Sequence, residues 1–258
     1  MAIPGVIRAT AASFCGPTRS RNEDMAVLGG RCVRDAALVT EWTAADAGRP
    51  FLAAVLDGLG GHQGGDLASA VAGERLAAGV WEWPADATVA ELREGLEHLA
   101  EVMHEELGRL GEEDVERAGC GTTCTALAVS TLAMAILHIG DSRCYRRRDG
   151  VWVQVSEDHA IVIPDGQGGK ISRLIYALGA DLPELPPDLS DDLTDRCQPG
   201  DLFMLITDGV LAAAGSDERL LAAFDGATAQ EVLDRALSNG QAPDNVTAVR
   251  IEFGAIAG

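Results

Sequence analysis

The sequence predicts an α+β fold in which two antiparallel β-sheets pack face to face, with helices on the outside. Strand-like apolar runs fall into two clusters, and helical patterns are inserted into or appended to these clusters instead of alternating with single strands. Packing sheet on sheet would bury the apolar faces of both. Because 47% of the 258 residues are hydrophobic and no Pro-, Ser- or Gly-rich linker divides the chain, we expect one domain over residues 1–258.

The N-terminal part predicts three strands and a helix. Two short strands are expected at residues 7–14 and 25–28, separated by a polar stretch at residues 16–24. A third apolar run occupies residues 51–56 and ends abruptly. The glycine-rich segment that follows opens into a helix over residues 66–78.

A second helix shows the clearest periodicity in the chain. Large apolar residues recur there at spacings of three and four, which marks one buried helix face. These residues are Leu92, Leu96, Leu99, Met103, Leu107 and Leu110.

The middle of the chain predicts a strand meander followed by an irregular segment. Asp149-Gly150 is typical of a hairpin turn between the last two strands. Pro, Gly and Asp crowd residues 158–199, where only residues 171–178 have an apolar rhythm, and we expect a long, lid-like segment there. The meander strands are residues 122–129, 133–139, 144–147 and 151–155.

The C-terminal part begins and ends with a strand. Residues 202–207 form an apolar run, and residues 246–253 form the last strand. Between them lie two modest helical patterns at residues 216–224 and 228–238.

Composition narrows the class of protein. Acidic residues outnumber basic ones 40 to 20, so a net charge of -20 should repel nucleic acid and anionic lipid. The N-terminus lacks a signal-peptide pattern, and the apolar stretch at residues 124–139 is too short to span a membrane. The six cysteines show no C-x-x-C spacing that would predict a zinc ribbon. We therefore expect a soluble, cytoplasmic protein with reduced thiols.

Three carboxylates stand at the ends of strand-like runs. Asp57-Gly58 and Asp208-Gly209 each terminate an apolar run, and Asp244 stands just before the last one. A short carboxylate held rigidly at a strand end can help to cage a hard cation, which prefers oxygen ligands. The alternative for each Asp-Gly pair is an ordinary hairpin turn.

Eight short motifs occur in a fixed order between residues 19 and 247, and together they resemble the metal-dependent protein phosphatase (PPM) family, the type 2C serine/threonine phosphatases, in their compact bacterial form. The resemblance covers nearly the whole chain. The motifs are Arg19-Ser-Arg-Asn-Glu-Asp24; Val55-Leu-Asp-Gly-Leu-Gly-Gly-His-Gln-Gly64 with Ala68-Ser69; Gly121-Thr-Thr123; Ile139-Gly-Asp-Ser-Arg143; Glu157-Asp-His159; Ser172-Arg173 with Ala177-Leu-Gly179; Thr207-Asp-Gly209; and Asp244-Asn-Val-Thr247.

The resemblance implies an α-β-β-α sandwich with two Mn²⁺ or Mg²⁺ ions in a cleft between the sheet ends. Asp57 would bridge both ions, with the Gly58 carbonyl on one, and Asp208 and Asp244 would ligate the other. Glu23 and Asp24 would hold metal-bound waters, and Asp141 would help to hold a third, weaker ion.

The resemblance also implies a mechanism. A hydroxide bridging the two ions would attack phosphorus in line, so no covalent phosphoenzyme is needed. Arg19, five residues before Asp24, stands at the spacing of the family's phosphate-binding arginine, and its guanidinium suits bidentate contact with phosphate. Arg21 is the competing candidate, and an ordinary surface arginine is the structural alternative.

Two departures from the family pattern concern the leaving group and the flap. Some members have a histidine directly after Asp-Gly that protonates the leaving alkoxide; here Leu59 occupies that position, and we interpret His62, three residues later, as structural. Protonation would then fall to a metal-bound water. The flap is shortened to residues 160–172, which should alter substrate choice, and Asp165 is the one candidate to replace a lost third-metal ligand.

The leading hypothesis is a phosphoserine/phosphothreonine protein phosphatase that acts on substrates of a cognate kinase, as a monomer. The alternative is a catalytically silent module that only binds phosphorylated partners, although the presence of Asp57, Asp208 and Asp244 favours activity. A calcium-binding protein is disfavoured because the chain lacks a D-x-D-x-D-G loop.

Overall fold

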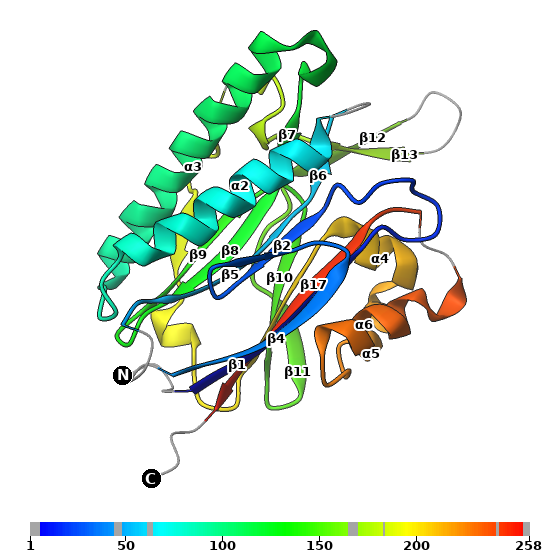
Figure 1. Ribbon diagram of the computed structural model, residues 1–258. Coiled ribbons are helices and arrows are strands. Elements are labelled where there is room, and N and C mark those ends of the chain that lie inside the picture. The colour runs from blue at the N-terminus through cyan, green and yellow to red at the C-terminus, as the bar shows by residue number, and fades with distance from the viewer. Residues whose placement is uncertain are drawn as a thin grey trace.

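Two six-stranded antiparallel sheets form the centre of the molecule (Figure 1), as the sequence predicts. The computed structural model describes residues 6–43, 48–60, 64–164, 170–182, 184–240 and 243–254. In spatial order the first sheet contains β11 (Val151–Gln154), β10 (Arg143–Arg148), β16 (Leu202–Ile206), β17 (Val246–Gly254), β1 (Val6–Phe14) and β4 (Ala36–Thr43). The second contains β15 (Ser190–Asp192), β9 (Met134–Ile139), β8 (Cys124–Val129), β5 (Phe51–Leu56), β2 (Met25–Leu28) and β3 (Arg31–Val33).

Helices cover the outer face of each sheet, so the layers are α-β-β-α (Figure 1). Helices α2 (Gly65–Gly79) and α3 (Val89–Glu113) pack on the second sheet. On the first sheet lie α4 (Asp208–Ala214), α5 (Asp217–Ala223) and α6 (Ala229–Ala236). Single 3₁₀ turns occur at Val80–Glu82, Val115–Arg117, Thr194–Arg196 and Leu237–Asn239.

The apolar core lies in three layers, one between the sheets and one under each group of helices. Strands β5, β8 and β9 are buried along their whole lengths because both of their faces are covered. This explains why their sequences are continuous apolar runs without alternation. Phe203 of β16 and Phe253 of β17 meet between the sheets with ring centroids 5.6 Å apart.

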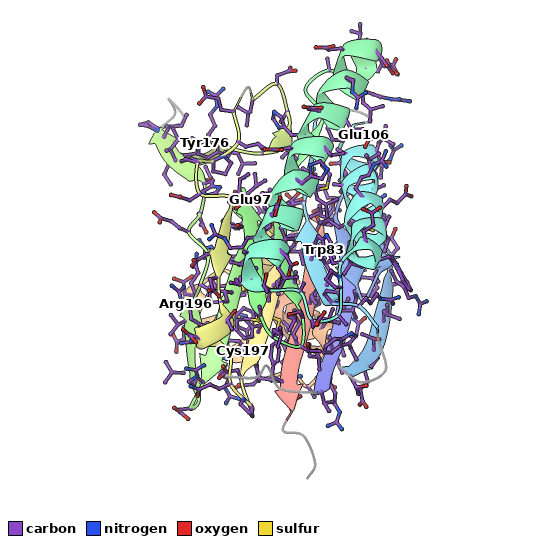
Figure 2. The ribbon with its side chains drawn as sticks, turned by 90° about the vertical axis from the view of Figure 1, so that its left-hand side faces the viewer. Trp83, Glu97, Glu106, Tyr176, Arg196 and Cys197 are labelled. Atoms are coloured by element: carbon purple, nitrogen blue, oxygen red, sulfur yellow. The ribbon has the colours of Figure 1, made fainter. Side chains whose placement is uncertain are left out.

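The predicted periodic helix is confirmed as α3. A capping box at Thr88 starts it: the Thr88 hydroxyl accepts from the Glu91 N–H, and the Glu91 carboxylate accepts from the Thr88 N–H. Viewed from the α3 side (Figure 2), the helix lies in front of the strands and runs in roughly the same direction as they do. The Glu106 carboxylate of α3 accepts a hydrogen bond from Nε of Arg75 in α2 at 2.7 Å. The Glu97 carboxylate accepts a hydrogen bond from the Ser190 hydroxyl of β15. The helix is therefore fixed at two points beyond its apolar face.

The prediction of an irregular segment over residues 158–199 is partly wrong. It contains the hairpin of β12 (Ala160–Pro164) and β13 (Lys170–Leu174), and also β14 and β15. Ile161 and Val162 are 47% and 65% exposed, so no core contact imposes a recognisable apolar pattern on β12. Strand β14 (Leu178–Gly179) joins β7 (Gly121–Thr122) and β6 (Gly58–Leu59) in a separate small sheet.

The turn at Asp149-Gly150 is confirmed, since both residues have positive φ, 50° and 82°, as a two-residue hairpin turn between β10 and β11 requires. All six cysteines are free, and four of them are buried. None of the described helices is both long and apolar enough to cross a membrane.

Truncation of Phe203 should destabilise the protein strongly. The Phe203→Ala change leaves a cavity between the sheets, and we expect it to lower the free energy of unfolding by about 3–5 kcal/mol in urea titration. The control is Val39→Ala on edge strand β4, where the side chain is 73% exposed and the change should stay within about 0.5 kcal/mol. Equal effects of the two substitutions would contradict the assignment of the inter-sheet core.

Candidate metal centre

Acidic side chains from both sheets meet at one end of the sandwich. Asp24 precedes β2 and Asp57 follows β5 in the second sheet, whereas Asp208 follows β16 and Asp244 precedes β17 in the first. They are close enough that Asp24, Asp208 and Asp244 all raise the pKa of Asp57. The gathering of these carboxylates, which the sequence predicts, is therefore present in the fold.

Asp57 is held through its backbone by two threonines. Its N–H donates to the Thr123 hydroxyl at 3.0 Å, and its carbonyl accepts from the Thr123 N–H at 2.9 Å and from the Thr122 hydroxyl at 3.0 Å. Burial is the main cause that raises the pKa of Asp57, followed by the charges of Asp24 and Asp208. Its carboxylate is thus fixed where negative charge is least favourable.

Asp24 is the most deeply buried acid of the group, with 1% of its surface exposed. Burial raises its pKa to about 7, although the Thr207 hydroxyl donates to the carboxylate at 2.8 Å and so opposes the shift. Burial likewise raises the pKa of Asp208, and the nearby Asp244 adds to it. The charges of these groups are therefore not compensated within the protein.

The two Asp-Gly pairs are not hairpin turns. Gly58 begins β6, and Gly209 lies inside α4; neither has positive φ. Both glycines are needed instead for close backbone approach: a Cβ on Gly58 would overlap the Gly65 carbonyl oxygen, and a Cβ on Gly209 would overlap that of Asn245. The glycine after each aspartate lets segments from distant parts of the chain come together beside it.

Arg19 lies beside Asp244, as the spacing predicts for a residue of the site. Its Nη2 donates to the Asp244 carboxylate at 2.7 Å, and its Nε donates to the Pro243 carbonyl at 3.4 Å. Arg21 pairs instead with Asp66 at the start of α2, at 3.1 Å. Of the two candidate arginines, Arg19 is therefore the one in contact with an acidic residue of the site.

Asn245 holds the loop that carries the N-terminal residues of the site. Its side-chain oxygen accepts from the Glu23 N–H at 2.9 Å, and its amide nitrogen donates to the carbonyls of Cys15 and Arg21 at 2.7 and 2.9 Å. Burial raises the pKa of Glu23, and the guanidinium of Arg19 opposes this. Asn245 follows Asp244 directly, so the segment that carries the Asp244 carboxylate also holds the loop of Glu23.

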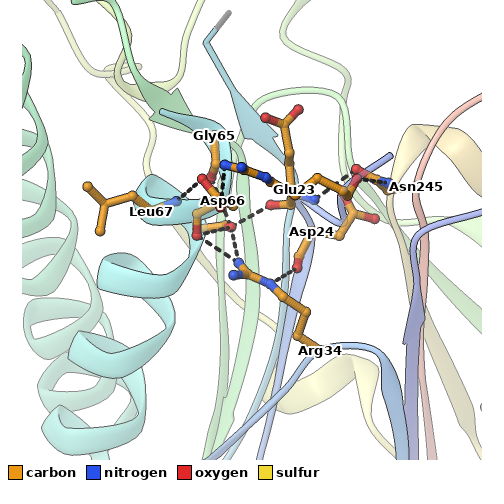
Figure 3. A network of polar contacts seen from close by, with 9 residues as sticks. Glu23, Asp24, Arg34, Gly65, Asp66, Leu67 and Asn245 are labelled. Carbon is orange, nitrogen blue, oxygen red and sulfur yellow. Dashed lines mark hydrogen bonds and ion pairs between the residues drawn. The ribbon is translucent and has the colours of Figure 1, made fainter. Parts of the chain in front are cut away.

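Arg34 is a residue of the site region that sequence reasoning missed (Figure 3). Its guanidinium donates to the carbonyls of Asp24 and Asp66 at 2.8 and 2.9 Å and to the Ser69 hydroxyl at 2.6 Å. The Ser69 hydroxyl in turn donates to the Glu23 carbonyl. Arg34 thereby joins the acidic loop to the first turn of α2. No motif marks it, because its partners are two backbone carbonyls and one hydroxyl that only folding brings together.

Asp141 lies in the loop between β9 and β10. Burial raises the pKa of Asp141 to about 6, and the charge of Asp208 adds to this. The neighbouring Ser142 hydroxyl shares a hydrogen bond of 2.8 Å with Thr123, which also holds Asp57. The structure thus brings Asp141 to the same acidic cluster. His62 and Asp165 lie outside the described residues.

The chemistry of these donors fits divalent cations. Several carboxylates with raised pKa values face one another, and Arg19 is the cation hydrogen-bonded to the group. In the part of the chain that the structure describes, no three acidic, histidine or cysteine side chains form a ready-made metal site. Asp244 is engaged by Arg19 and by the Asn245 N–H. The residues therefore suit ions that take part of their oxygen ligands from the backbone and water.

A family model described as protein phosphatase 2C matches residues 27–240. Among curated proteins, serine/threonine protein phosphatase PstP of Mycobacterium tuberculosis is 29% identical over 259 residues, which cover 95% of this chain and 44% of the relative. Protein phosphatase PhpP of Streptococcus pneumoniae is 29% identical over 220 residues, covering 80% of this chain and 87% of the relative. The chain therefore spans less than half the length of PstP but most of the length of PhpP.

Solved structures show the same fold. A crystal structure of the Mycobacterium tuberculosis phosphatase PstP/Ppp superimposes with a TM-score of 0.73 at 26% identity, covering 96% of this chain and 99% of that chain. A structure of the PstP catalytic domain in complex with two manganese ions has a TM-score of 0.69 at 27% identity, covering 96% and 98%.

The buried Asp24 should make the chelator-treated protein less stable as the pH rises. Its pKa is about 7 when folded and near 3.8 when unfolded, so the folded state binds more protons between these values and loses stability across that range as the pH increases. This difference in pKa corresponds to a loss of roughly 4 kcal/mol at most in the free energy of unfolding. Asp24→Asn removes this group, and urea titration from pH 4 to pH 8 should show a flatter profile than the wild type. Parallel profiles would contradict the assignment.

Proposed function

Because this chain belongs to the protein phosphatase 2C family, we propose that it hydrolyses phosphoserine and phosphothreonine in proteins with the help of two divalent metal ions. The observation that carries the proposal is the uncompensated carboxylate cluster at the meeting ends of the two sheets, with Arg19 beside it. A phosphate ester would add negative charge beside these carboxylates. Bound cations are therefore needed to offset the charges of the carboxylates and of the phosphate.

In this proposal Asp57, Asp208 and Asp244 would hold the two ions together with the Gly58 carbonyl. Glu23 and Asp24 orient water around the ions, as outer groups of metal sites commonly do. Asp141 contributes to a third, weaker position. The two manganese ions bound to the PstP catalytic domain support Mn²⁺ as the cofactor, and Mg²⁺ is the other candidate.

The protein's own groups have distinct tasks in the reaction. A pair of bound divalent cations lowers the pKa of the water held between them and so supplies a hydroxide for direct attack on phosphorus. Arg19 holds the phosphate: it is 44% exposed in its side chain, and its guanidinium can contact two phosphate oxygens at once. Thr122, Thr123, Thr207 and Asn245 keep the carboxylates and the acidic loop in position.

Substrates and partners follow from the same reasoning. Phosphorylated proteins produced by a serine/threonine kinase are the proposed substrates, because PstP and PhpP are named as protein phosphatases. The net charge of -20 argues against nucleic-acid partners. We further propose that the domain works as a monomer in the cytoplasm.

Hydrolysis of para-nitrophenyl phosphate should require Mn²⁺ and stop on chelation. Asp57→Asn and Asp208→Asn should each lower kcat/KM by more than about 100-fold, because even groups that only orient metal ligands are worth 10–100-fold. Asp234→Asn on α6 is the matched control, since that carboxylate is exposed and bonds only to Gln230 of the same helix. Metal-independent turnover would contradict the mechanism. Binding of a phosphopeptide without turnover would favour the silent module.

Replacement of Arg19 should weaken phosphate binding. Arg19→Lys keeps the charge but removes the planar fork, and we expect KM for para-nitrophenyl phosphate to rise about tenfold. Arg21→Lys, whose partner is Asp66, is the control and should change KM by less than about twofold. Neither pair is buried, so thermal unfolding should be nearly unaffected. A larger effect at Arg21 would reverse the assignment.

A further inference from the structure

A second cavity adjoins the candidate metal centre. It has a volume of about 340 Å³, and Asp141 and Asp208 are among the residues that line it. The rest of its wall comes from the β12–β13 hairpin, from strand β16 and from helix α4, through residues such as Val162, Ile206 and Leu211. Its volume lies in the range of small ligand-binding pockets, which runs from about 300 to 1,000 Å³.

The hairpin presents one of its two faces to this cavity. Val162 and Ser172 are opposite each other in the β12–β13 register, so their side chains share a face, and both line the cavity. Ile161 and Arg173 form the next pair and therefore lie on the other face, away from the lining. Figure 1 shows the hairpin projecting at the same end of the molecule as β6 and the first turn of α2.

Two further charged residues of the cavity wall, Arg143 and Asp158, form an ion pair. Arg143 donates to both carboxylate oxygens of Asp158, with its shortest contact at 2.7 Å, and a further guanidinium N–H donates to the Tyr145 hydroxyl. The amide of Gln154 also donates to Asp158. Arg143 thus neutralises Asp158, and Asp141 and Asp208 are the other two carboxylates among the described lining residues, whereas Val162, Ile206 and Leu211 make part of the wall apolar.

We propose that this cavity binds an apolar side chain of the phosphoprotein, that of the residue directly before or directly after the phosphorylated serine or threonine, and that Val162 and Leu211 determine this preference. The inference rests on the proposed function. Consecutive Cα atoms are 3.8 Å apart, so a neighbouring side chain can reach a pocket that shares two acidic walls with the metal centre. An aliphatic side chain matches the walls, whereas an acidic one would face Asp141 and Asp208.

The test compares phosphothreonine peptides that differ only in having Leu or Ser directly before or directly after the phosphothreonine. With Mn²⁺ present, phosphate release should give kcat/KM about tenfold higher for Leu than for Ser at one of these positions, the lower end of what an apolar pocket contributes. Val162→Asp should bring this Leu/Ser ratio close to one. Ile161→Asp, on the opposite face of the same strand, is the matched control and should keep the wild-type ratio.

Three results would overturn the inference while leaving the proposed function intact. These are a Leu/Ser ratio near one in the wild type at both positions, an unchanged ratio in Val162→Asp despite lower rates on all peptides, and an equal loss of the ratio in Ile161→Asp. A wild-type protein that hydrolyses neither these peptides nor para-nitrophenyl phosphate with Mn²⁺ would instead overturn the proposed function itself.

Discussion

The repulsion among carboxylates at the meeting ends of the two sheets is the constraint on which the rest of the structure depends. Asp24, Asp57 and Asp208 all have raised pKa values, with burial as the first cause and neighbouring negative charge as a further one. Such a cluster opposes folding unless protons or cations neutralise it. The stability that tolerates it must come from elsewhere, and the three apolar layers, with strands buried on both faces, are its source.

Keeping the acids together requires backbone contacts that side chains would prevent. Gly58 lies against the Gly65 carbonyl, and Gly209 lies against the Asn245 carbonyl. Hydrogen bonds then fix the acids: threonine hydroxyls and N–H groups hold Asp57 and Asp24, and Asn245 holds the loop of Glu23. Each aspartate is thus placed by groups on a different element, so no element alone creates the site.

The sequence predicts many strands of the two sheets well because buried strands depend on local apolar patterns. Residues 25–28 and 51–56 agree with β2 and β5 to the residue, since a strand covered on both faces must be apolar throughout. Strands β3 and β4 and the β12–β13 hairpin were missed, because exposed positions such as Val39 and Val162 carry no burial pattern. Helix α4 was missed because Asp208-Gly209 was interpreted as a possible turn. Arg34 could not be found, since its partners are mostly backbone carbonyls from distant segments.

Burial also distinguishes the acidic cluster from the β12–β13 hairpin. The acidic cluster is tied to the core of both sheets, so a change there disturbs charge balance and backbone contact together. The two strands of the β12–β13 hairpin pair with each other, and its exposed residues Ile161 and Val162 contribute little to the core. Arg143 and Asp158 join the base of this hairpin to the strand that follows Asp141. Residues on the hairpin's cavity face can therefore vary with little cost in stability, which suits the role in substrate selection proposed for this face beside the proposed metal centre.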